Sequence, residues 1–309
     1  MKSRIWIALI ALYIVWGSTY LAIRFAVETI PPFLMAGTRF LVSGLILYVW
    51  RKLAGDRNPT ARQWRSAVIV GLLLVLGGNG IVSWAEQHVA SGIAALMVAS
   101  IPLWIAILDA ARPGGIKPDW KIALGLLIGF SGITLLIASS RGLTPTDGRD
   151  IVGLFALLLA ALLWSIGSIY GRDSDMPESS LLGTGIEMLG GAAGLMLVGT
   201  VSGEWAGLNV SAVSTASLVG LVYLILFGSL VGFVSYTWLL RQAPLSLVST
   251  YAYVNPVVAV FLGAWIGSEM INARIVVSAL IIIGSVAVIN LSKKTRPRND
   301  EAPAASPAD

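Results

Sequence analysis

The sequence predicts an all-α integral membrane protein of ten transmembrane helices, and three observations support this fold class. Of the 309 residues, 56% are hydrophobic and only 12% are charged, whereas a soluble domain carries about 25% charged residues. Ten apolar windows follow one another, each near the roughly 20 residues that a helix needs to cross a bilayer. The alternation typical of a β-barrel is missing, so helices are the remaining way to pair the backbone polar groups in lipid.

The first five windows are bounded by charged residues, glycine and proline, and they form a predicted first repeat over residues 1–140. The first window follows Lys2 and Arg4, as the apolar part of a signal peptide would. Its length and the lack of a small-residue cleavage site after it predict a retained helix instead. The five windows are Ile5–Ala26, Phe33–Trp50, Ser66–Ala85, Val89–Asp109 and Trp120–Ser139.

The next five windows form a predicted second repeat over residues 150–292. Glycine and serine dilute the hydropathy of its second and third windows, which makes these two the weakest signals in the chain. The windows are Ile151–Tyr170, Ser180–Val201, Thr215–Leu240, Leu245–Gly267 and Ala273–Leu291. Residues 293–309 are rich in proline, alanine and charge, and a disordered cytoplasmic tail is expected there.

The distribution of basic residues predicts the orientation in the membrane. Sixteen of the 21 Lys and Arg residues lie at one end of the predicted bundle, in the loops that precede or follow its helices and in the tail. Only Arg24, Arg141, Arg149 and Arg274 fall at the other end. Because short cytoplasmic loops are enriched in Lys and Arg, both termini are predicted to lie in the cytoplasm of a multi-pass protein of the cell membrane.

Charge and cysteine content exclude several other classes. The net charge of +5 would suit a nucleic-acid binder, but the basic residues are spread over short loops, so no nucleic-acid partner is expected. Cysteine is absent, which excludes disulfides, thiolate metal sites and thiol catalysis. The expected partners are the lipid bilayer and a small-molecule substrate.

An internal duplication with a period of about 150 residues links the two sets of windows. Residues of the same type recur in the same order, and the offset only grows along the chain, as small loop insertions would cause. The matches are Trp16 with Trp164 and Arg24 with Arg172; Gly44-Leu45 with Gly194-Leu195; Gly78, Trp84 and Pro102 with Gly232, Trp238 and Pro256; and Gly129 with Gly284.

Each half has an odd number of predicted helices, so the second half must be inverted relative to the first. Such a 5+5 inverted repeat is a recurring plan of secondary transporters, with the substrate site near the middle of the membrane between the halves. Two similar halves of opposite orientation also give two states of similar energy, one open to each side. The sequence therefore favours a carrier.

Several short motifs make the chain resemble the drug/metabolite transporter superfamily, specifically its ten-helix EamA-type exporters. The resemblance covers residues 5 to 292 and implies export or facilitated passage of small metabolites, amino acids or drugs without ATP. The motifs are Trp16-Gly17-Ser18; Pro31 with Thr38-Arg39-Phe40; Trp84-Ala85-Glu86 with Ser91-Gly92, Ala94-Ala95-Leu96 and Pro102-Leu103; and Tyr253-Val254-Asn255-Pro256-Val257 with Gly267 and Glu269.

Polar and aromatic side chains inside the windows are the candidates for a substrate cavity. Trp16 and Tyr20 share a helix face, as do Trp164 and Ser168. Pro256 would free a backbone carbonyl in a segment rich in hydroxyls. Packing, helix contacts and a structural kink are the competing interpretations. The predicted cavity residues are Trp16, Ser18, Tyr20, Asn79, Ser100, Trp164, Ser168, Tyr236, Tyr251, Tyr253 and Asn255.

Four charged residues at membrane depth are candidates for gating. An unpaired charge there costs roughly 2.5–3.5 kcal/mol on insertion scales, so each should seek a partner. The predicted pairs are Arg39 with Glu86 at the outer end and Glu187 with Arg241 at the inner end, each formed in one access state. Snorkelling of Glu86 and Arg241 to water is the alternative.

A membrane channel or a membrane scaffold without transport remains open as a different class of function. A membrane-embedded enzyme is not expected, because the single histidine rules out paired-histidine and Ser-His-Asp sites. No cofactor or metal is expected. Proton antiport, exchange and facilitated passage stay open as modes of coupling.

Overall fold

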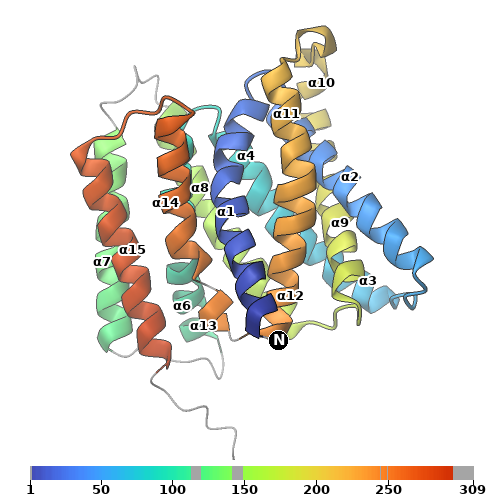
Figure 1. The fold of residues 1–309 in the computed structure, drawn as a ribbon, viewed down its shortest axis with the longest axis horizontal. Coiled ribbons are helices and arrows are strands. Elements are labelled where there is room, and N and C mark those ends of the chain that lie inside the picture. Colours follow the sequence, from blue (N-terminus) through green and yellow to red (C-terminus); the bar gives the residue numbers. More distant parts are fainter. Residues whose placement is uncertain (1, 113–119, 141–148, 244, 249, 295–309) are drawn as a thin grey trace, which may run out of the picture.

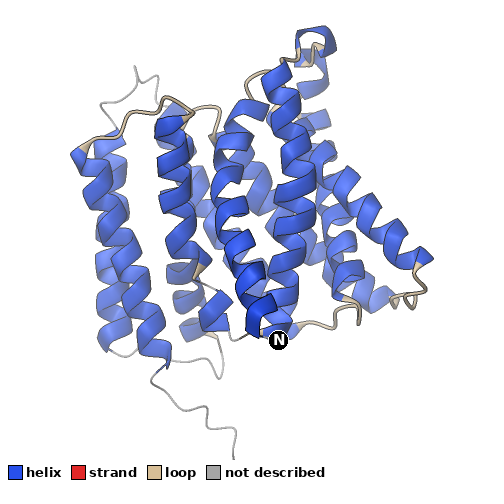
Figure 2. Ribbon diagram, viewed as in Figure 1, coloured by secondary structure: helices blue, strands red, loops and turns tan. Residues whose placement is uncertain are grey.

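The computed structural model describes residues 2–112, 120–140, 149–243, 245–248 and 250–294, and every regular element in these ranges is helical (Figure 2). Eight helices are long and apolar enough to cross a membrane, and the shorter apolar helices Val254–Trp265 and Ala273–Ile289 complete the ten predicted windows. The all-α, multi-span fold is thereby confirmed. The predicted tail lies outside the described residues, apart from the end of the last helix.

The first half contains five successive spans that run alternately up and down the bundle (Figure 1). The third span is continuous but contains a π-helical middle, and the fourth is broken in two. The elements are α1 (Lys2–Ala26); α2 (Pro32–Leu53); α3 (Ala61–Gly71), η1 (Leu72–Gly80) and α4 (Ile81–Ala85); α5 (Ser91–Val98) and α6 (Ile101–Ala111); and α7 (Trp120–Ser140).

The second half repeats this order. Two short helices, α10 (Glu204–Gly207) and the 3-10 turn η2 (Val210–Ala212), are inserted between its second and third spans. The spans are α8 (Arg149–Asp173); α9 (Ser180–Val201); α11 (Thr215–Tyr223), η3 (Leu224–Phe233) and α12 (Val234–Gln242); α13 (Leu245–Val248) and α14 (Tyr251–Trp265); and α15 (Ala273–Lys294). We call the end of the bundle at which α1 begins the N-terminal end.

The two π-helical segments occupy corresponding places in the two halves. Each follows an α-helical start and precedes an α-helical end in the third span of its half, and each is rich in glycine and leucine. A π-turn is wider than an α-turn, and such turns are frequent at functional sites. Within η1, the side-chain amide of Asn79 donates to the carbonyl of Leu74 at 3.3 Å.

The fourth span of each half contains a proline, and the two prolines differ in their effect on the helix. Helix α5 ends at Val98, and α6 restarts at Ile101 with Pro102 in its first turn, where the missing N–H leaves no bond unmade. Pro256 instead lies inside α14, which continues to Trp265. A break therefore lies next to Pro102, whereas the helix continues past Pro256.

Two peripheral helix pairs, α2 with α9 and α7 with α15, flank the central spans (Figure 1). Glycine allows their close approach. A Cβ on Gly129 would lie 2.7 Å from the hydroxyl of Ser285, and one on Gly44 would lie 3.1 Å from the carbonyl of Gly185. Gly284, the match of Gly129 in the duplication, differs, because a Cβ there would meet nothing within 4 Å.

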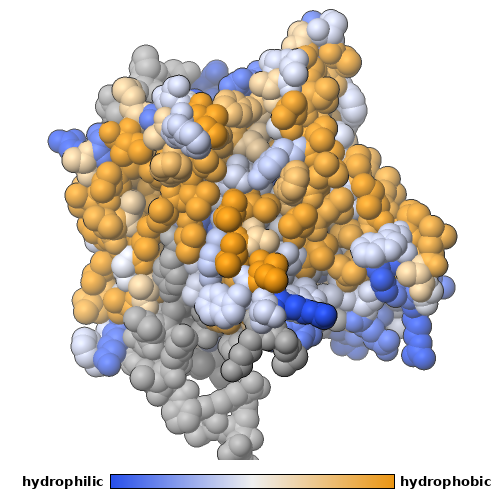
Figure 3. All heavy atoms as spheres, viewed as in Figure 1, coloured by the Kyte–Doolittle hydropathy of each residue, from blue (hydrophilic) through white to orange (hydrophobic). Residues whose placement is uncertain are grey.

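The lipid-facing surface is apolar around the spans. Figure 3 shows hydrophobic residues over most of the visible face and hydrophilic ones towards its ends. Leu127 and Phe261 are 72% and 61% exposed, a state that water would disfavour and a bilayer does not. The surface agrees with the multi-span assignment.

The turn between α2 and α3 is held by a salt bridge outside the spans. Arg51 donates to both carboxylate oxygens of Asp56 at 2.6 and 2.9 Å. These bonds, with a further bond from Ser179, lower the pKa of Asp56 to about 2. The turn is completed by Gly55, whose φ of 90° favours glycine.

Candidate functional site

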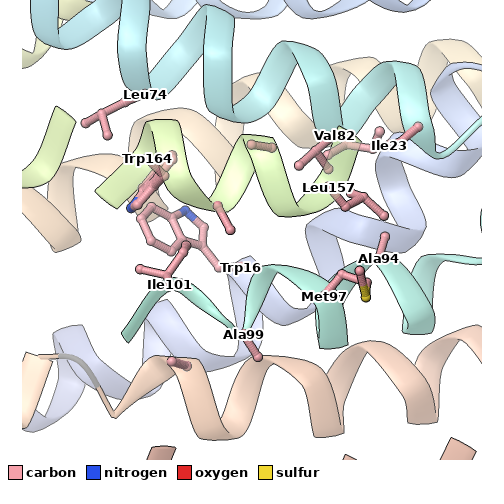
Figure 4. Packing of buried hydrophobic residues seen from close by; sticks show 14 of the residues in the cluster. Trp16, Ile23, Leu74, Val82, Ala94, Met97, Ala99, Ile101, Leu157 and Trp164 are labelled. Atoms are coloured by element: carbon pink, nitrogen blue, oxygen red, sulfur yellow. The ribbon is translucent and has the colours of Figure 1, made fainter. Parts of the chain in front are cut away.

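A cluster of five aromatic rings lies at the centre of the bundle, where both halves meet. Trp16 from α1 is its hub, with ring centroids 5.0–5.8 Å from those of Trp164, Phe233, Tyr236 and Tyr251. Figure 4 shows Trp16 and Trp164 side by side. Most contacts are edge-to-face or tilted, the arrangement that aromatic quadrupoles favour.

Each of the two tryptophans packs against a glycine of the opposite half, an arrangement that we call crosswise seating. A Cβ on Gly232 would lie 2.4 Å from Trp16 Nε1, and one on Gly78 would lie 2.8 Å from Trp164 Cε3. Any larger residue would displace the indole, so both positions require glycine. These are four of the residues matched in the predicted duplication, and the structure brings them together in two equivalent pairs.

Trp16 is also fixed by a hydrogen bond to the π-helical segment. Its Nε1 donates to the backbone carbonyl of Gly228 in η3 at 3.2 Å. The π-helical geometry of η3 places a carbonyl oxygen where this indole can use it. The local irregularity and the aromatic cluster are therefore parts of one arrangement.

A cavity of about 70 Å³ lies against this cluster and contains six of the predicted site residues. The six are Trp16, Tyr20, Asn79, Trp164, Tyr251 and Asn255. At about 30 Å³ per water molecule, it has room for two or three waters. A substrate of ordinary metabolite size fits only after the helices around it separate.

The cavity also contains residues that the sequence analysis did not select. Thr19 and Ile23 lie on the same face of α1 as Trp16 and Tyr20, so helical spacing alone would have found them. Gly78 was matched only as part of the duplication, and the gating candidate Arg39 also lines the cavity. The remaining additions are apolar and carry no distinguishing signal in the sequence: Val82, Val98, Ile101, Ala160 and Phe233.

A second, larger cavity of about 590 Å³ lies on the N-terminal side of the cluster. It reaches exposed Arg172 in the last turn of α8 and exposed Asp175 in the loop that follows, so it opens at that end of the bundle. Ser168, Tyr236 and Glu187, all selected from the sequence, line this cavity instead of the small one. Phe233 lines both. We call this space the vestibule.

Two of the predicted cavity serines lie outside both cavities. Ser100 is fully buried, and its hydroxyl donates to the carbonyl of Met97. Ser18 bonds the carbonyl of Val15 and the hydroxyl of Tyr223 at 2.6 Å. The side chain of Tyr253 lies outside the described residues, so its predicted role stays a prediction.

Arg39 is buried and only partly satisfied. It is 2% exposed, its Nε donates to Ser229 Oγ at 2.9 Å, and its Nη1 has no hydrogen-bond partner. Its guanidinium lies 4.5 Å from the ring centre of Phe40. A Cβ on Gly228 would lie 2.9 Å from Nη2, so the absence of a side chain there makes room for the guanidinium.

Glu86 is buried near Arg39, but the predicted pair is not formed in this conformation. Glu86 is 2% exposed, neither carboxylate oxygen has a hydrogen-bond partner, and no ion pair within 4 Å joins it to Arg39. The pair stays a prediction for another conformation. Glu187 lines the vestibule, and the side chain of its predicted partner Arg241 lies outside the described residues.

Two other carboxylates hold the end of the bundle opposite the N-terminus. Glu269 accepts hydrogen bonds from the backbone amides of Ser91 and Gly92, at 2.7 and 3.0 Å, and lies 3.7 Å from Arg24. Glu204 accepts from Phe33 and Leu34 at the start of α2. Glu269 is one of the residues that carry the family resemblance, whereas no pattern in the sequence pointed to Glu204.

Comparisons with known proteins agree with this architecture. The model of the EamA-like transporter family matches residues 3–138 and again residues 151–291. An uncharacterized inner membrane transporter of Escherichia coli, YedA, is 38% identical over 292 residues, which cover 94% of this chain and 92% of that protein. The uncharacterized transporter YoaV of Bacillus subtilis is 26% identical, covering 90% of this chain and 94% of YoaV.

The fold is also found in a solved structure. One crystal structure superposes with a TM-score of 0.65 at 18% sequence identity, covering 96% of this chain and 100% of that one. At this identity the likeness concerns the fold alone.

Proposed function

This chain belongs to the EamA-like transporter family, and on that premise we propose that it is a secondary transporter that exports small organic molecules by alternating access. Its place in the family makes it a membrane transporter of small molecules. Export, the alternating mechanism and the site residues are the parts that we propose. The observation that carries them is the crosswise seating of Trp16 and Trp164 on glycines of the opposite half.

This crosswise seating supports two halves that are related by inversion. The corresponding π-helical segments and the twofold match of the family model to the chain support the same relation. In an inverted repeat, the second half can adopt the conformation of the first, which opens the site to the other side. The large vestibule on one side and the closed contacts of Glu269 and Glu204 on the other then correspond to one of these two states.

The vestibule is proposed to face the cytoplasm. The basic loops gather at the N-terminal end, where the vestibule opens, and short cytoplasmic loops carry the excess of Lys and Arg. A reporter fused after residue 294 should be active only if the tail is cytoplasmic. A periplasmic result would contradict both the orientation and the even number of spans.

The substrate is proposed to bind in the small central cavity after it widens. Trp16, Tyr20, Asn79, Trp164, Tyr251 and Asn255 would contact it there. Ser168, Tyr236 and Glu187 would contact it on its way through the vestibule. The Arg39–Glu86 and Glu187–Arg241 pairs are proposed to form as the respective ends rearrange.

Counterflow in proteoliposomes tests the proposal and separates a carrier from a channel. Vesicles are loaded with amino acids, nucleobases or organic acids, and uptake of the labelled compound is followed. A carrier gives saturable uptake that the internal compound accelerates, whereas a channel gives no acceleration. Ala substitution of Trp164 should abolish the acceleration, while the exposed Val201→Ala variant serves as control.

A further inference from the structure

The described residues that line the small cavity include one positively charged side chain and no negatively charged one. Among the described residues that line it, Arg39 is the one ionised side chain, and the others offer hydroxyl, amide, indole or apolar groups. A carboxylate is missing from this lining. A cationic ligand would therefore find repulsion here, and a zwitterion would find a partner for its negative group only.

The guanidinium of Arg39 is fixed in place and has an unused hydrogen-bond donor. Its Nε is occupied by Ser229, which fixes the plane of the guanidinium, while Nη1 has no protein acceptor. Glu86 is the acceptor that the sequence predicts for Arg39, yet the two side chains make no ion pair. A buried charge with an unused donor is expensive at membrane depth. Such groups mark substrate pathways by default.

The cavity also fixes the shape of what Arg39 can receive. The indole rings of Trp16 and Trp164 and the ring of Tyr251 form an apolar wall in the same cavity. Aromatic rings of this kind pack well on flat or aromatic bodies. A guanidinium and an aromatic wall in the same cavity fit a molecule with one anionic end and an apolar body.

We propose that Arg39 binds the anionic group of the transported molecule, and that this group is a carboxylate on an apolar, aromatic body without a compensating ammonium. The proposal rests on the proposed transport function and names its substrate class. Arg39 Nη1 would donate to the carboxylate, a charge-assisted bond of the strong type. Glu86, close by and unpaired, would take over Arg39 when the carboxylate leaves.

Direct binding to the full-length protein in detergent tests this without any transport. Isothermal titration compares phenylacetate with its neutral counterpart phenylacetamide and with cationic phenethylamine. We expect phenylacetate to bind about tenfold tighter than the amide, equivalent to about 1.4 kcal/mol, and the amine to bind weakest. Equal affinities for acid and amide, or no binding of phenylacetate at millimolar concentration, would overturn the proposal.

Variants locate the effect. Arg39→Gln should lose the preference for the acid over the amide, and Arg39→Lys should keep part of it because the charge remains. Arg62→Gln, at an exposed position of α3, is the matched control and should bind like the wild type. Thermal unfolding confirms that each variant is folded. A preference that survives Arg39→Gln would place the anion elsewhere.

The outcome is separable from that of the transport proposal. If counterflow is observed with neutral or cationic compounds while acids and amides bind equally, the chain is a carrier and the role of Arg39 is wrong. If phenylacetate binds through Arg39 but no compound shows counterflow, the binding site stands and alternating access is wrong.

Discussion

Removing the carboxylate of Glu269 should destabilise the protein at the end opposite the N-terminus. Glu269 comes from the loop after α14 and satisfies two backbone amides at the start of α5. The first amides of a helix have no partner within the helix, so an external acceptor is needed. The carboxylate side chain is only 8% exposed, and water does not easily replace it.

The expected loss follows from the bonds involved. Loss of a helix cap costs about 0.5–2 kcal/mol, and a hydrogen bond to a charged group contributes about 1.5–3 kcal/mol. The pairing with half-exposed Arg24 adds less than about 1 kcal/mol. Because the amides share one carboxylate, Glu269→Ala should cost roughly 2–4 kcal/mol. At about 2–4 °C per kcal/mol for a chain of this order of size, Tm should fall by about 4–16 °C.

Thermal unfolding in detergent, followed by intrinsic fluorescence, measures this shift. Glu269→Gln should give an intermediate value, because its amide oxygen still accepts one bond. Gly263→Ala should mimic the loss, since its Cβ would lie 2.5 Å from Glu269 Oε2. Glu28→Ala, an exposed carboxylate at the same end, is the control. If Glu269→Ala unfolds within 1 °C of Glu28→Ala, the capping argument is refuted.

Three further outcomes are expected. Gly71→Ala should lower Tm strongly, because its Cβ would lie 2.0 Å from a backbone oxygen of α9. Gly284→Ala meets open space and should raise Tm slightly, because alanine has a helix propensity about 1 kcal/mol better than glycine. Equal Tm values for the two variants would contradict this reasoning. Gly232→Ala should displace Trp16 and reduce counterflow at least tenfold while leaving membrane insertion unchanged; full activity would show that the indole position is unimportant. The lowered pKa of Asp56 stabilises the fold fully above about pH 4, and this contribution is lost as pH falls towards 2. The Asp56→Asn variant should therefore show a flatter dependence of Tm on pH in that interval. An unchanged slope would show that the Arg51–Asp56 salt bridge is not the source of the pH dependence.

Hydropathy was sufficient to place the helices, because length and apolar content decide which segments can enter a bilayer. The predicted window Ser180–Val201 coincides with α9, and Ala273–Leu291 lies within α15. The π-helical segments η1 and η3 could not be predicted in this way. A widened turn changes the spacing of residues around the helix but not their mean hydropathy, so it leaves no trace in a hydropathy window.

The aromatic residues of the candidate site could be predicted from the sequence, whereas the positions of the serine hydroxyls could not. Trp16 and Trp164 recur at matching places inside corresponding helices, and the structure brings them together, whereas Trp120 and Trp265, at the ends of their helices, are exposed. Ser100 instead bonds the carbonyl of Met97 within its own span, a local bond that serine forms readily in a helix. The Arg39–Glu86 pair is not formed in this structure, and the proposal that it forms in another conformation concerns a state that a sequence does not specify.

The vestibule has a consequence for the electric field across the membrane. Its volume of about 590 Å³ would hold on the order of 20 water molecules, and water at that depth carries the potential of the adjoining solution inward as far as Phe233. The membrane voltage would then fall mainly across the remaining thickness, which contains the small cavity and Arg39. Moving one elementary charge through the full potential is worth about 2.3 kcal/mol per 100 mV. An anion that leaves this cavity towards a positive exterior would therefore be driven outward by the resting voltage.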